Sequence, residues 1–116
     1  MSLAGCSEEG EFSGGDSNND SGSSSDLELL SHNMNFEQGE YTSELKVVGQ
    51  AENVSGGELD YAEVEVKFLN DGAVEETSLD NINGLGAGQK WNFEVLYLGQ
   101  NPEVISDYQI RAGTSL

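Results

Sequence analysis

The alternation of apolar and polar residues from Tyr61 to Leu69 constrains the fold more than any other stretch of this chain. Every second side chain there is apolar, and a period of two places those side chains on one face of a β-strand. Asn70-Asp71-Gly72 follows directly. Because Asp and Gly tolerate a positive φ, this tripeptide predicts a tight hairpin turn and an antiparallel partner strand.

Other stretches with strand patterns lie on both sides of this hairpin. One or two opening strands are expected between Leu27 and Phe36, and further strands are expected at 44–54, 73–79, 90–98 and 104–112, with a glycine-rich loop at 80–88. About seven short strands in roughly 90 residues, separated by frequent turn signals, predict an all-β fold, an antiparallel immunoglobulin-like β-sandwich. Its core is expected to contain Val47, Val64, Val66, Phe68, Trp91, Phe93 and Tyr108.

Residues 1–26 differ in composition from the rest of the chain and predict a disordered tether. Residues 7–26 are an acidic linker made mostly of Gly, Ser, Asp and Asn. Leu3-Ala4-Gly5-Cys6 resembles a lipobox, in which lipid is attached to the cysteine of a bacterial or archaeal lipoprotein. We therefore expect residues 1–26 to hold a lipid anchor on Cys6 and a flexible linker, and residues 27–116 to form the folded domain. The alternative for Cys6 is an incidental free thiol.

The charge balance excludes several classes of partner. The chain has 22 acidic residues and 4 basic ones, a formal charge of -18. Such a surface repels nucleic-acid phosphates and anionic lipid headgroups, so we expect no nucleic acid partner and membrane contact only through a lipid anchor. Many acids with few lysines are also typical of halophilic proteins, in which molar salt screens the repulsion between carboxylates. The alternative is an ordinary acidic extracellular domain.

No pattern of reactive residues predicts catalysis or a metal centre. His32 is the only histidine and Cys6 the only cysteine, too few for a structural zinc site, and the chain has no nucleophile-elbow motif. We therefore expect no enzymatic activity, no catalytic residue, no metal ligand and no cofactor. Two sequons make Asn19 and Asn53 candidate N-glycosylation sites.

Short motifs follow one another through the folded part of the chain: Gly49-Gln50-Ala51-Glu52-Asn53, Tyr61-Ala62-Glu63-Val64-Glu65-Val66-Lys67-Phe68, Asn70-Asp71-Gly72, Leu85-Gly86-Ala87-Gly88 and Trp91-Asn92-Phe93. In order and spacing, these motifs resemble the FxLYD domain family from about Leu27 to Gly113. Domains of that family recur in prokaryotic extracytoplasmic lipoproteins, including those of haloarchaea, and have no established enzymatic activity. The resemblance therefore implies the fold and a role in interaction or structure.

The namesake motif of the family is degenerate in this chain. Val66-Lys67-Phe68-Leu69-Asn70 stands where the family has Phe-x-Leu-Tyr-Asp. The apolar positions of the motif keep their alternation, while its tyrosine and aspartate are replaced by Leu69 and Asn70. The resemblance thus implies the fold, and it implies no function that depends on that Tyr and Asp.

These observations together predict an extracytoplasmic, lipid-anchored β-sandwich that acts as a non-catalytic interaction or spacer module for a protein or envelope component. The alternative is a secreted acidic domain that binds a metal ion or a solute. The candidate partner surface is the outward face of the strand at 61–69, which carries Glu63, Glu65 and Lys67. Pairing at an exposed strand edge is a second contact mode open to such a fold.

Overall fold

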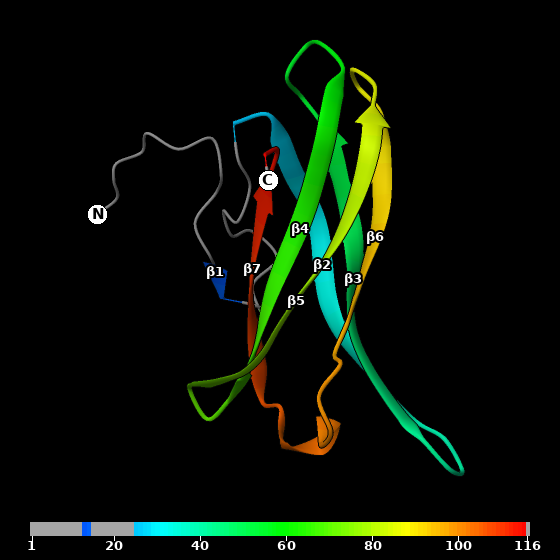
Figure 1. The fold of residues 1–116 in the computed structure, drawn as a ribbon, viewed down its shortest axis with the longest axis vertical. Helices are drawn as coiled ribbons and strands as arrows, with labels where there is room; N and C mark the ends of the chain where they lie inside the picture. The colour runs from blue at the N-terminus through cyan, green and yellow to red at the C-terminus, as the bar shows by residue number, and fades with distance from the viewer. Residues whose placement is uncertain (1–12, 15–24, 116) are drawn as a thin grey trace.

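The computed structural model describes residues 13–14 and 25–115, and most of them lie in β-strands (Figure 1). The long strands are β2 (Leu27–Gln38), β3 (Ser43–Asn53), β4 (Leu59–Asn70), β5 (Ala73–Leu85), β6 (Lys90–Leu96) and β7 (Asp107–Gly113). The two-residue strand β1 (Ser13–Gly14) precedes them, and a 3-10 helix, η1 (Pro102–Val104), lies between β6 and β7. The remainder of the expected tether, with Cys6 and Asn19, lies outside the described residues.

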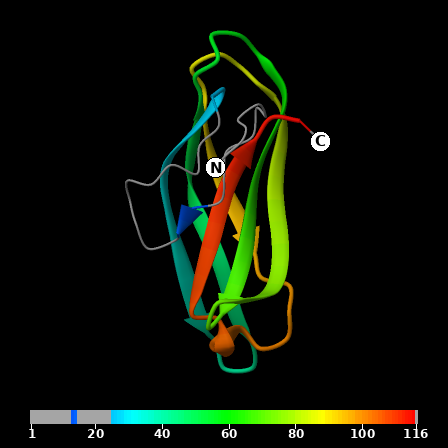
Figure 2. The same ribbon diagram turned by 90° about the vertical axis from the view of Figure 1, so that its left-hand side faces the viewer.

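Two antiparallel sheets pack face to face, as Figure 2 shows. One sheet has the strand order β1-β7-β4-β5 and the other has the order β2-β3-β6. Taken in chain order, β2, β3 and β6 match strands A, B and E of an immunoglobulin sandwich, and β4, β5 and β7 match strands C, C′ and F. β1 pairs with β7 at the place of strand G, and no described strand takes the place of strand D beside β6. The predicted antiparallel immunoglobulin-like β-sandwich is therefore confirmed.

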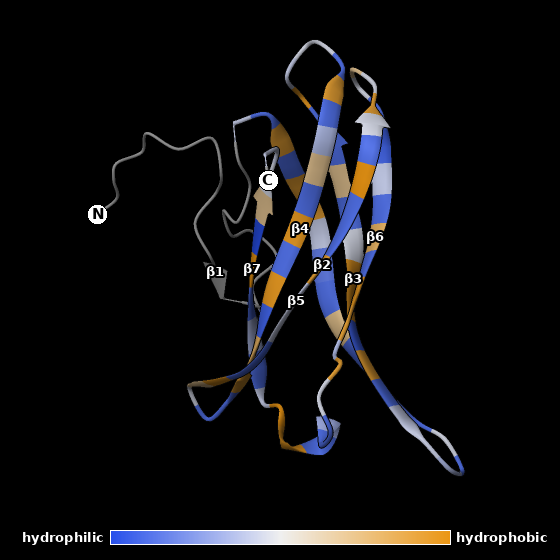
Figure 3. Ribbon diagram, in the orientation of Figure 1, coloured by the Kyte–Doolittle hydropathy of each residue, from blue (hydrophilic) through white to orange (hydrophobic). Residues whose placement is uncertain are grey.

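β4 is a central strand of its sheet, with β5 on one side and β7 on the other. The β4–β5 hairpin closes through Asp71 and Gly72, whose φ angles are 52° and 89°. Positive φ at both central positions is the signature of a type I′ turn, so the predicted hairpin is confirmed. Figure 3 shows hydrophobic and hydrophilic residues alternating along β4, which gives the strand one face for the core and one for the outside.

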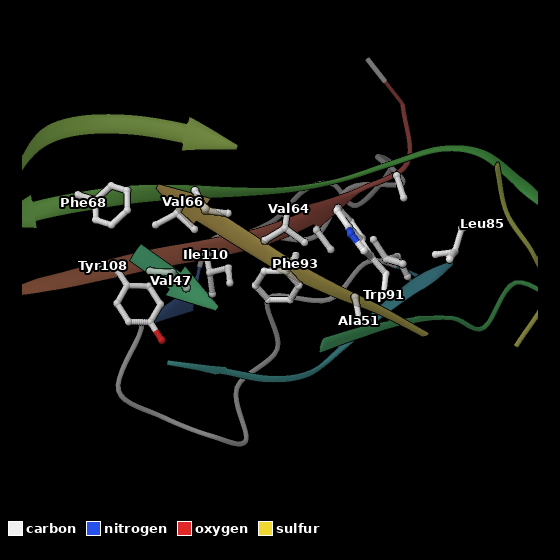
Figure 4. Packing of buried hydrophobic residues seen from close by; sticks show 14 of the residues in the cluster. Val47, Ala51, Val64, Val66, Phe68, Leu85, Trp91, Phe93, Tyr108 and Ile110 are labelled. Atoms are coloured by element: carbon white, nitrogen blue, oxygen red, sulfur yellow. The ribbon is translucent and has the colours of Figure 1, made fainter. Parts of the chain in front are cut away.

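Inward-facing side chains of both sheets form one apolar core (Figure 4). Every residue predicted for the core is buried: Val47, Val64, Val66, Phe68, Trp91, Phe93 and Tyr108. Trp91 and Phe93 meet edge to face with ring centroids 6.1 Å apart, and Phe68 meets Tyr97 in the same way at 5.2 Å. Burial raises the pKa of the Tyr97 hydroxyl, and the nearby carboxylate of Glu75 raises it further.

Two strands, β2 and β5, have boundaries that differ from the prediction. The opening segment is one continuous strand, β2, with a bulge between Leu29 and Ser31. The predicted loop at 80–88 is wrong for residues 80–85, because β5 continues to Leu85 and pairs with β4 as far as Leu59. Pairing with a long neighbour thus outweighs the weak strand propensity of the Asp, Asn and Gly residues at 80–84.

A buried polar contact joins the sheets on the side where β2 and β7 lie next to each other (Figure 2). His32 Nδ1 and the Tyr108 hydroxyl share a hydrogen bond of 2.7 Å, and the two rings meet edge to face. His32 is 4% exposed. Because buried polar groups need such partners, His32 has a packing role in this fold.

Candidate functional site

The outward face of β4 carries the three residues that the sequence predicts as a partner surface. Arg111 of β7 lies opposite Glu65 in the sheet, and its Nη2 atom is 2.5 Å from Glu65 Oε1 and 3.6 Å from Glu63 Oε2. The Tyr61 hydroxyl donates a 2.7 Å hydrogen bond to Glu63 Oε1, and burial together with this contact raises the pKa of Tyr61. Glu63 is only 7% exposed, while Glu65 and Lys67 are half-buried. This face therefore offers a partner less free carboxylate than the sequence alone implies.

A cleft of about 450 Å³ lies between β5 and β6, on the opposite side of the sandwich from the His32–Tyr108 contact. Within the described residues, both strands are sheet edges here, because β5 pairs only with β4 and β6 only with β3. We call this cleft the β5–β6 groove. Its lining residues are Glu65, Thr77, Ser78, Leu79, Asp80, Glu94, Leu96 and Leu98.

Three leucines of the β5–β6 groove are exposed to solvent. The exposed fractions are 46% for Leu79, 40% for Leu96 and 70% for Leu98. A single exposed leucine is ordinary on a protein surface, whereas a group that lines one cleft is typical of a contact site. The groove is therefore the apolar candidate site of the domain.

The backbone of β6 also points into the groove. The N–H of Tyr97 donates to the carbonyl of Leu45 on β3 at 2.9 Å, so the residues of β6 in phase with Tyr97 are bonded to β3. In an antiparallel ladder the intervening residues direct their N–H and C=O groups to the other side. On the groove side these intervening residues are Asn92, Glu94 and Leu96.

Polar side chains of β5 reach the same edge. Asp80 Oδ2 accepts a 2.9 Å hydrogen bond from the Glu94 N–H, which shows that this N–H faces the groove. Ser78 Oγ is buried and has no hydrogen-bond partner among the described residues. The Glu94 carboxylate lies 2.8 Å from Lys46 Nζ, and the hydrogen bond between them raises the pKa of Lys46. The groove therefore combines apolar walls with polar groups, most of them hydrogen-bonded and one of them, the Ser78 hydroxyl, without a partner among the described residues.

The sequence prediction did not single out these leucines. Leu79 ends a predicted strand and has no unusual neighbour in the chain. The sequence did contain one signal for Leu96 and Leu98. They alternate with inward-facing residues, so they fall on the outward face of their strand; the inward-facing residues are Trp91, Phe93, Val95 and Tyr97. Several apolar residues grouped on the outward face of a strand indicate a contact surface.

Asn53, which the sequence predicts as a glycosylation site, has a structural role in the folded domain. The side chain is fully buried, and its Nδ2 donates to the carbonyls of Gly57 at 2.7 Å and Leu85 at 2.8 Å. A glycan on Nδ2 would remove one of these two donors from the folded domain. The sequon is a property of three residues, whereas burial of Asn53 depends on the packing of distant strands.

The described residues hold no group of three or more His, Cys, Asp and Glu side chains placed to bind a metal ion. No helix in this part of the chain is long and apolar enough to span a membrane. The β5–β6 groove presents a strand edge, three leucines and carboxylates.

Comparisons with protein-family models, with curated proteins and with solved structures find no match for this chain. Fold and groove define an immunoglobulin-like β-sandwich with an open site between two sheet edges. The similarity to FxLYD domains stays a prediction.

Proposed function

We propose that this chain is an extracytoplasmic, lipid-anchored β-sandwich of the FxLYD type that acts as a non-catalytic interaction or spacer module for a protein or envelope partner. The observation that carries the proposal is the open β5–β6 groove with its exposed leucines. The lipobox-like Leu3-Ala4-Gly5-Cys6 and the polar linker at 7–26 support the anchored location.

The positions of β1 and β2 suit a domain displayed on such an anchor. The strand starts at Leu27, directly after the linker, and its 12 residues extend over about 40 Å. The hairpin that joins β2 to β3 lies at the far end of the sandwich in Figure 1 and carries Tyr41, which is 91% exposed. Ser13–Gly14, between Cys6 and Leu27, pairs with β7 as β1, at the sheet edge opposite β5. A lipid on Cys6 would therefore attach the domain through its β1–β7 edge and leave the β5–β6 groove, at the opposite edge, open to partners.

Replacing Cys6 with alanine is expected to release the protein from the membrane, because the lipid is the only membrane contact in the proposal. The measurement is the distribution of the native protein between membrane and soluble fractions of its own cells. Cys6→Ala should move most of the protein to the soluble fraction, and Ser7→Ala is the matched control that should leave it on the membrane. A Cys6→Ala protein that stays with the membrane would remove the anchor from the proposal.

The full chain, used as bait on native envelope extract, is expected to retain a defined set of proteins. A spacer module alone would retain none, so this measurement separates the two roles within the proposal. The alternative, a secreted acidic domain that binds a metal ion or a solute, predicts a stoichiometric site in a calorimetric calcium titration, and the proposal predicts none.

Salt is expected to stabilise the domain, as the halophilic interpretation of the charge requires. Arg111 pairs with Glu63 and Glu65, and Lys46 pairs with Glu44 and Glu94, but the chain has 22 acids for 4 bases. Because molar salt reduces the screening length to about 3 Å, we expect the melting temperature to rise by about 10 °C between 0.1 and 2 M KCl. Sucrose is the control for general exclusion effects, and a melting temperature indifferent to KCl would contradict the halophilic assignment.

A further inference from the structure

We propose that the β5–β6 groove binds an extended segment of a partner chain, with apolar residues alternating with basic ones, added as a strand along the free edge of β6. The inference rests on the interaction role proposed above and gives that role a surface and a class of partner. Its location is the place of strand D, which pairs with strand E in immunoglobulin sandwiches and has no counterpart in the described residues of this fold.

The backbone of β6 supplies the hydrogen bonds for such a strand. The groups of Asn92, Glu94 and Leu96 that face away from β3 have the two-residue spacing at which an added strand pairs. The Glu94 N–H is held at 2.9 Å by the Asp80 carboxylate. An incoming carbonyl takes over that N–H, and the Asp80 carboxylate then becomes free to bind a basic side chain of the partner.

The walls of the groove supply apolar contact. Leu79 lies on the β5 side and Leu96 and Leu98 lie on the β6 side, so alternate side chains of an extended segment can cover them. Ser78 Oγ, which is buried and has no hydrogen-bond partner among the described residues, gives one further reason for an occupant. A buried hydroxyl gains a hydrogen bond when a peptide group is placed within its reach.

The negative charge of the groove favours a basic partner segment. The charged residues that line the groove are Glu65, Asp80 and Glu94, all acidic. Arg111 and Lys46 pair with two of these carboxylates, yet the chain as a whole keeps a formal charge of -18. A basic segment is therefore attracted to the groove, while a second copy of this acidic chain is repelled from it.

The test uses the full chain and a fluorescent, end-capped peptide of about ten residues that alternates valine with lysine, a length that exceeds the edge of β6. Fluorescence anisotropy measures the affinity, and NMR of the 15N-labelled protein locates the contact. We expect the backbone amides of Asn92, Glu94 and Leu96 to shift on binding, and the amide of Tyr41 at the far hairpin to stay in place.

A matched pair of protein variants tests the apolar wall. Leu98→Ser is expected to weaken binding about fivefold, because it removes one leucine contact from an exposed position. Val104→Ser is the control, since Val104 is also exposed but does not line the groove. Both residues lie on the surface, so melting curves of both variants should match that of the wild-type chain.

Control peptides separate strand addition from simple charge attraction. A valine–lysine peptide with N-methyl groups on alternate backbone nitrogens keeps its charge and loses the hydrogen bonds of a strand, so we expect its affinity to fall more than about tenfold. A valine–glutamate peptide should not bind. Equal binding of the N-methylated or the acidic peptide, amide shifts away from β6, or no binding at all would overturn the proposal.

The outcome for the groove is distinguishable from the outcome for the proposed function. If the full chain retains envelope proteins while the valine–lysine peptide does not bind, the groove proposal fails and the interaction role stands. If the peptide binds, and the Leu98→Ser bait loses the envelope proteins that the Val104→Ser bait keeps, the groove is the surface through which the domain performs its interaction role.

Discussion

Replacing Gly49 with alanine is expected to lower the free energy of unfolding by about 3 kcal/mol or more. Gly49 lies in β3 between its register partners His32 on β2 and Phe93 on β6. A Cβ atom at this position would lie 2.1 Å from the carbonyl oxygen of Ser31 and 2.6 Å from Cζ of Phe93. Because the first of these atoms belongs to the backbone, relief of the clash requires β2 to move away from β3.

The measurement is urea and thermal unfolding of the full chain, with an expected fall in melting temperature of about 12 °C or more. Gly57→Ala is the matched control, because nothing lies within 4 Å of a Cβ built at Gly57. The same methyl group should therefore have little effect there. Equal melting temperatures for the two variants would show that the β2–β3 packing yields easily and would contradict the prediction.

The parts of this fold that could be predicted from the sequence are those with local causes. The inward residues of β4, Val64, Val66 and Phe68, follow from a period of two, and the Asp71-Gly72 turn follows from the tolerance of these residues for positive φ. Both signals lie within a few residues of the structure that they specify. They predict strands, turn and core without knowledge of which strands are neighbours.

The groove could not be predicted in the same way, because it is made by the absence of a neighbour. Leu79 and Leu96 come from different sheets, and they line one cleft only because no described strand lies beside β6. The burial of Glu63 has a similar cause, since Arg111 reaches it from β7. Sequence periodicity assigns a face to a residue, whereas strand order decides what that face meets.

Gly49 and Asn53 belong to the first of the motifs that resemble FxLYD domains, and both have packing roles in this structure. A motif of this kind specifies packing of the sandwich. Of the residues assigned to partner binding, Leu79, Leu96 and Leu98 lie outside the motifs, whereas Glu65 and Asn92 lie within them.

Replacing Asn53 with alanine is expected to destabilise the domain by about 3 kcal/mol, because the buried amide joins three segments of the chain. Its Nδ2 donates to the carbonyls of Gly57 and Leu85, and its Oδ1 accepts from the N–H of Ser55 at 2.9 Å and from the Ser55 hydroxyl at 2.8 Å. Alanine leaves these partners without the amide, and the Leu85 carbonyl loses a bond in a buried position.

Asn53→Asp is the near-isosteric comparison and separates hydrogen-bond donation from shape. The carboxylate keeps the acceptor for Ser55 and places a second oxygen against the carbonyls of Gly57 and Leu85, so it should cost at least as much as alanine. Asn92→Ala, at an exposed position with a single side-chain bond from Gln50, is expected to change stability by less than about 0.5 kcal/mol. Chemical unfolding of the three variants gives these differences. An Asn53→Asp protein as stable as the wild type would mean that Nδ2 does not hold the loop at Gly57 against the end of β5.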